Sequence, residues 1–437
     1  MPNLFLLPDY FAFIPLLFFI YSLYRSDSLN LRAFAVSLML YDGLCFIVGG
    51  STFDPIKTSG IILTIIYFGV YYNLRYSPYF ILFIIYLFAR DVINFIFSDL
   101  NIDLNSVRFS VQFFVNLIII WFLSRILFKG VDLRSRLDLV SRVCVFLISF
   151  SFLLSIYQIV AFNVGFPVNG IKSSYSLNVL GEIKYAAYNL GGVSIFRPYA
   201  LFGEPKFLAN VSSVCFIVVL YCMKYGVDSI LKIRYLIVAQ FSLLVLTAST
   251  SAMVSFVLAV IIYFLTNLRI SFRGVVFFGI IVFVSNMLFP SLREFIFDFV
   301  SNRLLERFSG ETGPLESHES FYADRWLADY FNFFLGSGYS YFYEYGFSQG
   351  FRSLPNATLI FYGIVGGIGG IFLLILSIYG SLIRVFYFIA FLPLIFVFFP
   401  FGSFLILMLF FNAISTCDVE YRSLAKISRF DGVHFKS

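Results

Sequence analysis

The sequence predicts an all-α polytopic membrane protein with about twelve transmembrane helices. The first observation is composition: of the 437 residues, 60% are hydrophobic and only 12% are charged. The mean hydropathy is +0.92, which is more apolar than a soluble chain of this length needs. The second is that apolar runs long enough to cross a bilayer recur along the chain. The third is that Lys and Arg gather in the short connections between these runs.

The composition also argues against several classes of protein. The 61 Phe and 29 Tyr are not interleaved with basic residues, so they indicate surfaces facing lipid and the membrane interface and argue against nucleic-acid binding. The cysteines lie mostly in apolar runs without metal-ligand spacing, so all of them are expected to be buried and free. They are Cys45, Cys144, Cys215, Cys222 and Cys417.

The predicted spans fall into two groups around a long central loop. The first group occupies residues 4–24, 33–50, 59–74, 79–97, 109–128 and 140–163. The second occupies residues 207–223, 235–248, 251–268, 274–290, 357–379 and 385–413. The polar stretch TASTSA at 247–252 predicts a tight hairpin or a broken helix, and Pro400 with Gly402 interrupts the last run.

Basic residues set the expected orientation. Those in the short connections, such as the group from Arg125 to Arg142, place these connections in the cytoplasm and both long loops on the outer side. The N-terminus lacks a basic region and a small-residue cleavage site, so the first run is expected to be a retained span. Basic residues in the tail favour a cytoplasmic C-terminus, which requires short or re-entrant helices near Pro400.

These assignments divide the chain into five consecutive segments. They are an N-terminal transmembrane bundle at 1–163, a first outer loop at 164–206, a central bundle at 207–290, a second outer loop at 291–355, and C-terminal helices with a tail at 356–437. Loops of this length are usually functional or disordered, and we expect both to be functional.

The stretch FRPYALFGEPKFLAN at 196–210 combines charge, proline and glycine directly ahead of an apolar run. It is expected to form a bent loop that enters a helix. Pro205 suits the first turn of that helix, and Glu204 would then lie at the positive end of the helix dipole. A helix N-terminus is also an anion-binding site, and Arg197 and Lys206 flank this one.

The second outer loop carries an acidic run that includes His318, followed by Arg325 and Trp326. Apolar residues recur at helical spacing from Glu319 to Leu335, which predicts an amphipathic helix on the outer membrane face. Gly336 and Gly338 are expected to end it.

An Arg ahead of a Leu-Phe-x-Glu-Pro turn, with a later outer loop carrying Arg-Trp and then Gly-x-Gly, resembles the O-antigen polymerase (Wzy) family and the related O-antigen ligases. The matching motifs are confined to Arg197–Leu208 and Arg325–Gly338, whereas the similar architecture covers most of the chain. The ligase branch typically carries a His-Asn pair and a Ser-Arg pair, and their places are taken here by Leu354-Pro355-Asn356 and Ser249-Thr250-Ser251. Both differences favour the polymerase.

The resemblance implies a GT-C-type glycosyltransferase that transfers a growing glycan from undecaprenyl diphosphate onto a lipid-linked repeat unit. It places the enzyme in the bacterial inner (cytoplasmic) membrane, with its chemistry at the periplasmic face and with no nucleotide donor or cofactor. Arg197 and Arg325 would bind the diphosphate, and Glu204 would belong to the active site. The implied partners are the lipid-linked donor and acceptor, membrane lipid and a chain-length regulator protein.

The chemical requirements of the reaction point to the same residues, independently of the resemblance. Departure of a diphosphate needs cations, and Arg meets phosphate oxygens with paired donors. The outer-side candidates are Arg197, Arg325 and Arg352, supplemented by Lys206, and no acidic metal-binding motif accompanies them, so a metal-independent reaction is expected. Glu204 and His318 compete for the role of the base that takes the acceptor proton, and Glu204 is preferred because it lies beside the anion site.

Structural roles compete with each assignment. Arg197 and Glu204 are candidates for a mutual ion pair, Arg325 for an interfacial residue, and His318 for a solvated one. Arg90 and Asp91 are expected to pair with another helix, with a proton or ion path as the lesser alternative. The glycines of span 357–379 are expected to be helix-packing contacts. A ligase and a lipid-oligosaccharide flippase remain the alternatives for the whole protein, although a flippase would favour an internal repeat, and none is seen.

Overall fold

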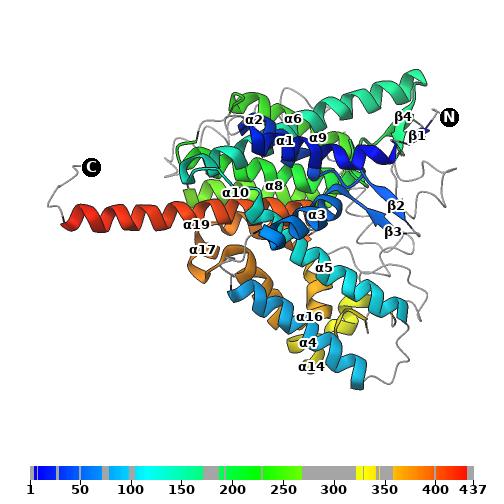
Figure 1. The fold of residues 1–437 in the computed structure, drawn as a ribbon. Helices are drawn as coiled ribbons and strands as arrows, with labels where there is room; N and C mark the ends of the chain where they lie inside the picture. The colour runs from blue at the N-terminus through cyan, green and yellow to red at the C-terminus, as the bar shows by residue number, and fades with distance from the viewer. Residues whose placement is uncertain are drawn as a thin grey trace. The chain divides into compact units, whose positions relative to one another are not determined.

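The computed structural model describes residues 4–6, 8–25, 29–48, 51–70, 78–97, 104–170, 187–190, 193–227, 230–267, 321–327, 329–340, 344, 358–397 and 400–430. Within these residues the fold is mostly helical, with short strands beside the helices (Figure 1). The chain divides into two compact units. Unit 1 comprises Met1–Arg75, Val115–Ser249 and Pro400–Ser437, and unit 2 comprises Tyr76–Phe114 and Thr250–Phe399. Each unit combines distant stretches of sequence, which is a different partition from the consecutive segments above.

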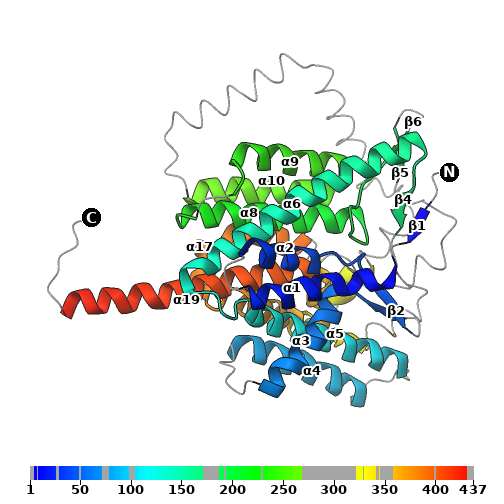
Figure 2. The same cartoon turned by 45° about the horizontal axis from the view of Figure 1, so that its top comes forward.

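Unit 1 is built around α8. Its helices are η1 (Asp9–Phe13), α1 (Ile14–Tyr24), α2 (Leu29–Met39), α3 (Pro55–Val70), α6 (Leu133–Val164), α8 (Pro205–Lys224), α9 (Ile233–Thr247) and α19 (Phe401–Phe430), together with the second half of α5 (Leu104–Ile126). Helix α8 packs against α6, α9 and α19, and α6 also packs against α2 (Figure 2). Because three helices pack against α8, every one of its side chains from Leu208 to Val219 is buried.

Three pairs of short strands, which the sequence did not predict, belong to unit 1. Strand β1 (Leu4–Leu6) runs parallel to β4 (Val168–Gly170), β2 (Phe46–Val48) is antiparallel to β3 (Ser51–Phe53), and β5 (Ala187–Leu190) is antiparallel to β6 (Val193–Phe196). Strands β1 to β4 lie at one end of unit 1, and the long helix α19 ends at the other (Figures 1 and 2).

The predicted run 33–50 is only partly helical. Helix α2 ends at Met39, a turn follows, and Phe46 and Phe53 stack with their ring centroids 5.1 Å apart in the β2–β3 pair. The polar Asp42 and the flexible Gly43 explain why an apolar run bends here, since both residue types favour turns.

Unit 2 contains the first half of α5, a helical stretch at 321–327, and the helices α4 (Pro78–Phe97), α10 (Thr250–Asn267), α14 (Tyr330–Leu335), α16 (Thr358–Tyr379), α17 (Leu382–Tyr387), η2 (Ile389–Phe391) and α18 (Leu392–Val397). Helix α16 packs against α4 and α14, and α10 packs against α18. The last predicted run is interrupted near Pro400 as expected, because α18 ends before it and α19 begins after it.

The glycines of α16 are packing contacts, as predicted. A Cβ on Gly363 would lie 2.6 Å from the Trp326 ring, and one on Gly366 would lie 2.6 Å from Leu87. Gly367 adopts φ +62°, so α16 is two helical segments joined at this residue. A side chain there would meet the Phe334 backbone at 2.4 Å, so only glycine fits.

Among the described residues, three helices are long and apolar enough to cross a membrane: Ser135–Val164, Pro205–Lys224 and Thr358–Tyr379. Shorter apolar helices are Asp9–Tyr24, Leu29–Met39, Ser110–Ile126, Ile233–Thr247, Ser251–Thr266 and Phe401–Ser415. The predicted break near 248–251 is confirmed, since α9 ends at Thr247, Ala248 adopts φ +48°, and α10 begins at Thr250. Cys45, Cys144, Cys215 and Cys222 are free and buried as predicted, and the Cys417 side chain lies outside the described residues.

Candidate functional site

The charged loop of residues 197–204 connects β6 to α8 and forms the candidate site of unit 1. Glu204 is the N-cap of α8, with φ −149° and ψ 153°, and Pro205 occupies its first turn, as the sequence predicted. The Glu204 side chain makes no capping hydrogen bond. Its Oε2 instead lies 2.9 Å from Lys206 Nζ, and 49% of the side chain is exposed. The start of α8 therefore presents a carboxylate and an ammonium group at an accessible position.

Gln158 of α6 holds the buried side of this loop. Its Oε1 accepts hydrogen bonds from the backbone N–H groups of Tyr199, at 3.1 Å, and Ala200, at 2.9 Å. Its Nε2 donates to the Ala200 carbonyl at 2.8 Å. Ala200 has φ +51°, a left-handed conformation that a residue with a side chain adopts only when its surroundings hold it there. The fully buried Gln158 supplies that restraint.

The turn after α2 holds the loop from another direction. The Gly43 N–H donates to the Leu201 carbonyl at 2.7 Å, and the Gly203 N–H donates to Asp42 Oδ1 at 2.7 Å. The Tyr41 ring contacts the Phe202 ring with centroids 4.8 Å apart. The loop is therefore fixed along its length before it reaches Glu204.

Arg197 lies at the start of the loop and is partly buried. Its Nε donates a hydrogen bond to the Thr247 carbonyl at the end of α9, at 2.8 Å. The sequence left open a mutual ion pair between Arg197 and Glu204, whereas the ion pair formed by Glu204 in the described structure is with Lys206. Arg197 is thus anchored through one nitrogen of its guanidinium to the backbone of a neighbouring helix.

Two carboxyl groups near this loop were missed by sequence reasoning. Asp42 is partly buried beside Gly203, and its burial, followed by the charges of Asp54 and Glu204, raises its pKa to about 7 against the opposing Gly203 hydrogen bond. Burial also raises the pKa of Asp54, against the opposing charge of Lys57 and local backbone hydrogen bonds. The available signal for Asp42 was that it is the lone acidic residue of the run 33–50.

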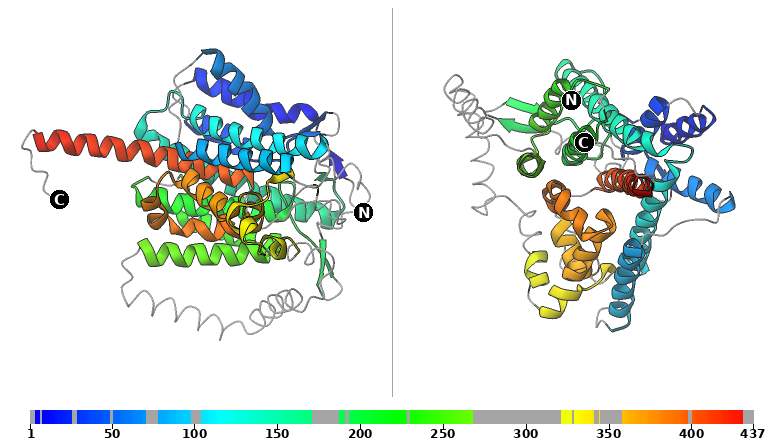
Figure 3. Two further views of the ribbon diagram at one scale, coloured as in Figure 1. Left: turned by 90° about the horizontal axis from the view of Figure 1, so that it is seen from below. Right: turned by 90° about the vertical axis from the view of Figure 1, so that its left-hand side faces the viewer.

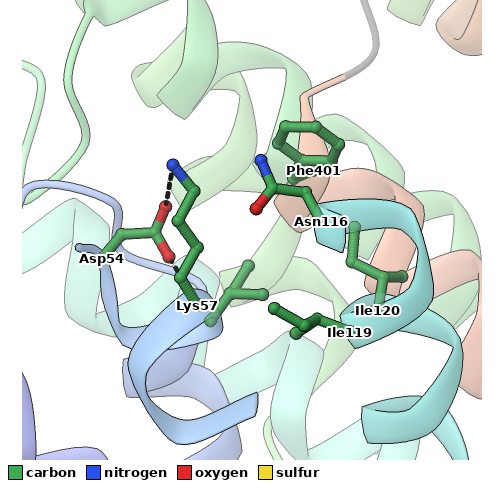
Figure 4. Close-up of a pocket in the computed structure, with 7 residues that line it drawn as sticks. Asp54, Lys57, Asn116, Ile119, Ile120 and Phe401 are labelled. Carbon is green, nitrogen blue, oxygen red and sulfur yellow. Dashed lines mark hydrogen bonds and ion pairs between the residues drawn. The ribbon is translucent and has the colours of Figure 1, made fainter. Parts of the chain in front are cut away.

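Asp54 and Lys57 flank a small recess in unit 1 (Figure 4). Asp54 Oδ1 accepts from the Lys57 N–H at 2.8 Å, and Asp54 Oδ2 lies 3.9 Å from Lys57 Nζ. Asn116, Ile120 and Phe401 contribute to the other walls. The volume of about 10 Å³ is near the minimum for one water molecule, so this recess is not a glycan site.

Arg325 belongs to unit 2 and is partly buried within the helical stretch 321–327. Tyr322 and Trp326, which flank it, pack with Ile364 of α16 in a small hydrophobic cluster. Trp326 Nε1 also donates to the Phe333 carbonyl at 3.3 Å. Arg325 is therefore carried by a segment that is fixed to α16. His318 and Arg352 lie outside the described residues.

The amphipathic helix predicted from Glu319 to Leu335 is interrupted, which corrects the sequence interpretation. Asp329 has an extended backbone, with φ −136°, and its side chain caps α14 by accepting from the Phe331 N–H. An aspartate favours an N-cap over a helix interior because its short side chain competes for backbone donors. Helix α14 ends before Gly336, as predicted. Its exposed aromatic residues are Tyr330, Phe331 and Phe334.

Arg90 and Asp91 of α4 bind the segment that follows α14. Arg90 Nε donates to the Leu335 carbonyl at 3.0 Å, and Arg90 Nη2 donates to the Gly336 carbonyl. Asp91 accepts from the Ser340 N–H at 2.7 Å, from Ser340 Oγ at 2.9 Å and from Ser110 Oγ. The expectation that this pair contacts another helix is confirmed by Ser110 of α5 and by Leu335 at the end of α14, whereas Gly336 and Ser340 lie beyond that helix. These contacts assign the pair a structural role.

Tyr86 and Asn94 extend the same face of α4, because residues four apart lie one above the other on a helix. Tyr86 Oη donates to the carbonyls of Leu335, at 3.1 Å, and Gly366, at 2.9 Å, while Asn94 Nδ2 donates to the Ser337 carbonyl. On its other side, the segment donates from the Ser337 N–H to Ile364 O at 2.7 Å. The Gly-x-Gly segment is thus fixed between α4 and α16 by hydrogen bonds on both sides.

In unit 1, a fixed loop that begins with Arg197 leads to the N-terminus of α8, where Lys206 lies in the first turn and pairs with Glu204. Among the described residues, no group of three or more potential metal ligands occurs. Comparison with family models, with curated proteins and with solved structures finds no match to this chain. The class that the described residues define is a mostly helical protein rich in apolar, membrane-type helices.

Proposed function

We propose that the protein polymerises O-antigen or a related surface polysaccharide, transferring a growing glycan from undecaprenyl diphosphate onto a lipid-linked repeat unit. The observation that carries the proposal is the charged loop at the start of α8. It combines Arg197, Lys206 and the N-terminus of a buried apolar helix on a backbone held by Gln158 and the turn at 41–43. A rigid cationic loop beside apolar helices is suited to a lipid diphosphate.

The chemistry assigns a role to each group. The Arg197 guanidinium offers paired donors to the diphosphate, and its anchor at the Thr247 carbonyl fixes its direction. The ion pair between Lys206 and Glu204 is partly exposed, and such pairs contribute only about 0–1 kcal/mol, so Lys206 can exchange its partner for a phosphate oxygen. These cations stabilise the charge that develops as the diphosphate departs.

Glu204 is the proposed base that takes the proton of the acceptor hydroxyl. Its carboxylate is accessible and lies at the same helix end as Lys206. Arg325 and Arg352 are proposed as further diphosphate ligands, and His318 as the alternative base. The reaction is proposed to need no metal ion or other cofactor.

The membrane arrangement completes the proposal. The proposal includes about twelve spans in a GT-C-like architecture within the bacterial inner membrane. The basic residues of the short connections support a site on the periplasmic side. Helix α19 runs to the end of unit 1 away from strands β1–β4 (Figures 1 and 3), and the basic residues of the tail favour a cytoplasmic C-terminus.

Reconstitution tests the proposal directly. Purified protein in liposomes is given undecaprenyl-diphosphate-linked repeat units from the native cell, without lipid A or any other acceptor lipid, and the glycans are separated by size. A polymerase produces a ladder of lipid-linked oligomers. A product that forms only when lipid A is added would identify a ligase, and movement of unmodified repeat units across the bilayer without new bonds would identify a flippase.

A further inference from the structure

Three consecutive residues after α2 contact three consecutive residues of the site loop. Tyr41 packs on Phe202, and its hydroxyl is hydrogen-bonded to Ser151 Oγ of α6 at 2.8 Å. Asp42 accepts from the Gly203 N–H, and Gly43 donates to the Leu201 carbonyl. The turn Tyr41–Gly43 is therefore bound both to α6 and to the site loop, so it fixes the position of the loop relative to α6.

Only certain side chains allow this approach. A Cβ on Gly43 would lie 2.2 Å from the Leu201 carbonyl oxygen, so the close contact requires glycine. Asp42 supplies a carboxylate oxygen to the N–H of Gly203, the residue directly before Glu204. A hydrogen bond to an ionised acceptor is stronger than one between neutral groups, so the charge state of Asp42 influences how firmly the peptide ahead of Glu204 is held.

Other charged groups lie on the elements of unit 1 near this turn and loop. On the neighbouring elements of unit 1 these are Asp54 and Lys57 at the β3–α3 junction, Glu204 and Lys206 at the start of α8, and Arg197 ahead of them. Of these, Asp54 and Glu204 raise the pKa of Asp42 by like charge, in addition to the larger effect of burial, to about 7. Because the pKa lies above the ordinary value of a carboxyl group, Asp42 is ionised above pH 7 and becomes neutral as the pH falls through about 7.

We propose that Asp42 is a positioning residue, whose carboxylate holds Gly203 and Glu204 in the geometry that glycosyl transfer requires. The position of the loop follows from the contacts alone, whereas its effect on turnover rests on the proposed function. Asp42 acts through the backbone of the loop, and Glu204 remains the group that meets the acceptor.

Hydrogen–deuterium exchange of the loop peptide tests the contact without any activity. Asp42→Ala removes the acceptor, so exchange at Gly203 is expected to become faster by about tenfold to a hundredfold. Asp42→Asn keeps an acceptor oxygen but loses the charge, so at pH 8 it is expected to exchange faster than the wild type and more slowly than Asp42→Ala. Gly43→Ala forces the turn away without changing charge and is expected to accelerate exchange as well. Asp138→Asn is the matched control, because Asp138 pairs with Arg142 on α6 at 2.8 Å.

The pH dependence separates positioning from simple structural support. After correction for intrinsic exchange, the wild-type loop is expected to lose protection as the pH falls from 8 to 6, about one unit on either side of the Asp42 pKa. Asp42→Asn is expected to be flat over that range. Wild-type exchange rates in Asp42→Ala, or equal pH dependence in Asp42→Asn and the wild type, would contradict the claim that the Asp42 carboxylate holds the loop.

The polymer ladder then tests the catalytic consequence. In Asp42→Ala, kcat is expected to fall at least about tenfold, with the KM for the donor within about threefold, because Arg197 keeps its anchor at the Thr247 carbonyl while Glu204 is misplaced. Asp42→Asn is expected to have a kcat at pH 8 between those of the wild type and Asp42→Ala, and to vary little between pH 6 and 8. An unchanged kcat in Asp42→Ala would contradict the positioning role. Absence of polymer from the wild-type protein would contradict the proposed function. In that case hydrogen–deuterium exchange alone would test whether Asp42 holds the loop.

Discussion

Replacement of Gln158 by alanine tests how the site loop is held. The change removes one acceptor and one donor that together satisfy the Tyr199 N–H, the Ala200 N–H and the Ala200 carbonyl. A buried backbone group left without its partner costs about 1–3 kcal/mol. At the lower end of that range, the loss of these contacts destabilises the closed loop by about 3 kcal/mol, which corresponds to a hundredfold more opening.

Hydrogen–deuterium exchange across the loop measures this opening, with thermal unfolding in detergent as a check on the rest of the fold. Gln158→Ala is expected to accelerate exchange from Tyr199 to Gly203 by about a hundredfold while exchange in the middle of α8 changes little. Asn163→Ala on the same helix is the matched control, since Asn163 is exposed and donates to the Ile159 carbonyl of its own helix. Wild-type exchange in the Gln158 variant would refute the reasoning, because the left-handed Ala200 would then need no restraint.

Glu204→Gln is expected to lose turnover while donor binding persists, because the amide keeps the shape of the carboxylate but does not accept a proton; near-normal turnover, together with loss in His318→Ala, would transfer the role to His318. Polymer formation is expected to continue in excess chelator, and activity that disappears and returns with magnesium or manganese would contradict a metal-independent reaction. Arg90→Met removes two hydrogen bonds to backbone carbonyls and is expected to lower the free energy of unfolding by about 3 kcal/mol, whereas the same change at the exposed Arg108 is expected to lower it much less. Equal melting temperatures for these two variants would show that the Arg90 contacts do not stabilise unit 2.

Local features of the fold were predictable because their causes lie within a few residues. Pro205 suits the first turn of a helix and Glu204 the position before it, and the structure has both there. The break near Ala248 and the helix end at Gly336 follow in the same way from polar and glycine residues. The Asp329 N-cap was missed because the apolar periodicity on either side of it suggested one continuous helix.

The long-range contacts of the candidate site could not be predicted from one sequence. Gln158 meets Ala200 across 42 positions of the chain, and Asp42 meets Gly203 across 161. Which polar residue of an apolar run faces which loop depends on how helices α2, α6 and α8 pack, and periodicity does not specify that packing. The sequence therefore indicated the charged loop, whereas the residues that hold it, Gln158 and Asp42, could be identified only from the structure.

The most direct test of the central claim is polymerisation by Arg197 variants in the reconstituted system. The Arg197→Ala protein is expected to insert normally and make no ladder, because loss of a cation at the departing diphosphate removes about 3 kcal/mol or more of transition-state stabilisation. Arg197→Lys is expected to recover only part of the activity, since a point charge lacks the paired donors. Lys224→Ala, at the other end of α8, is the control and is expected to polymerise normally. A full-length ladder from Arg197→Ala would contradict the assignment of this loop as the diphosphate site.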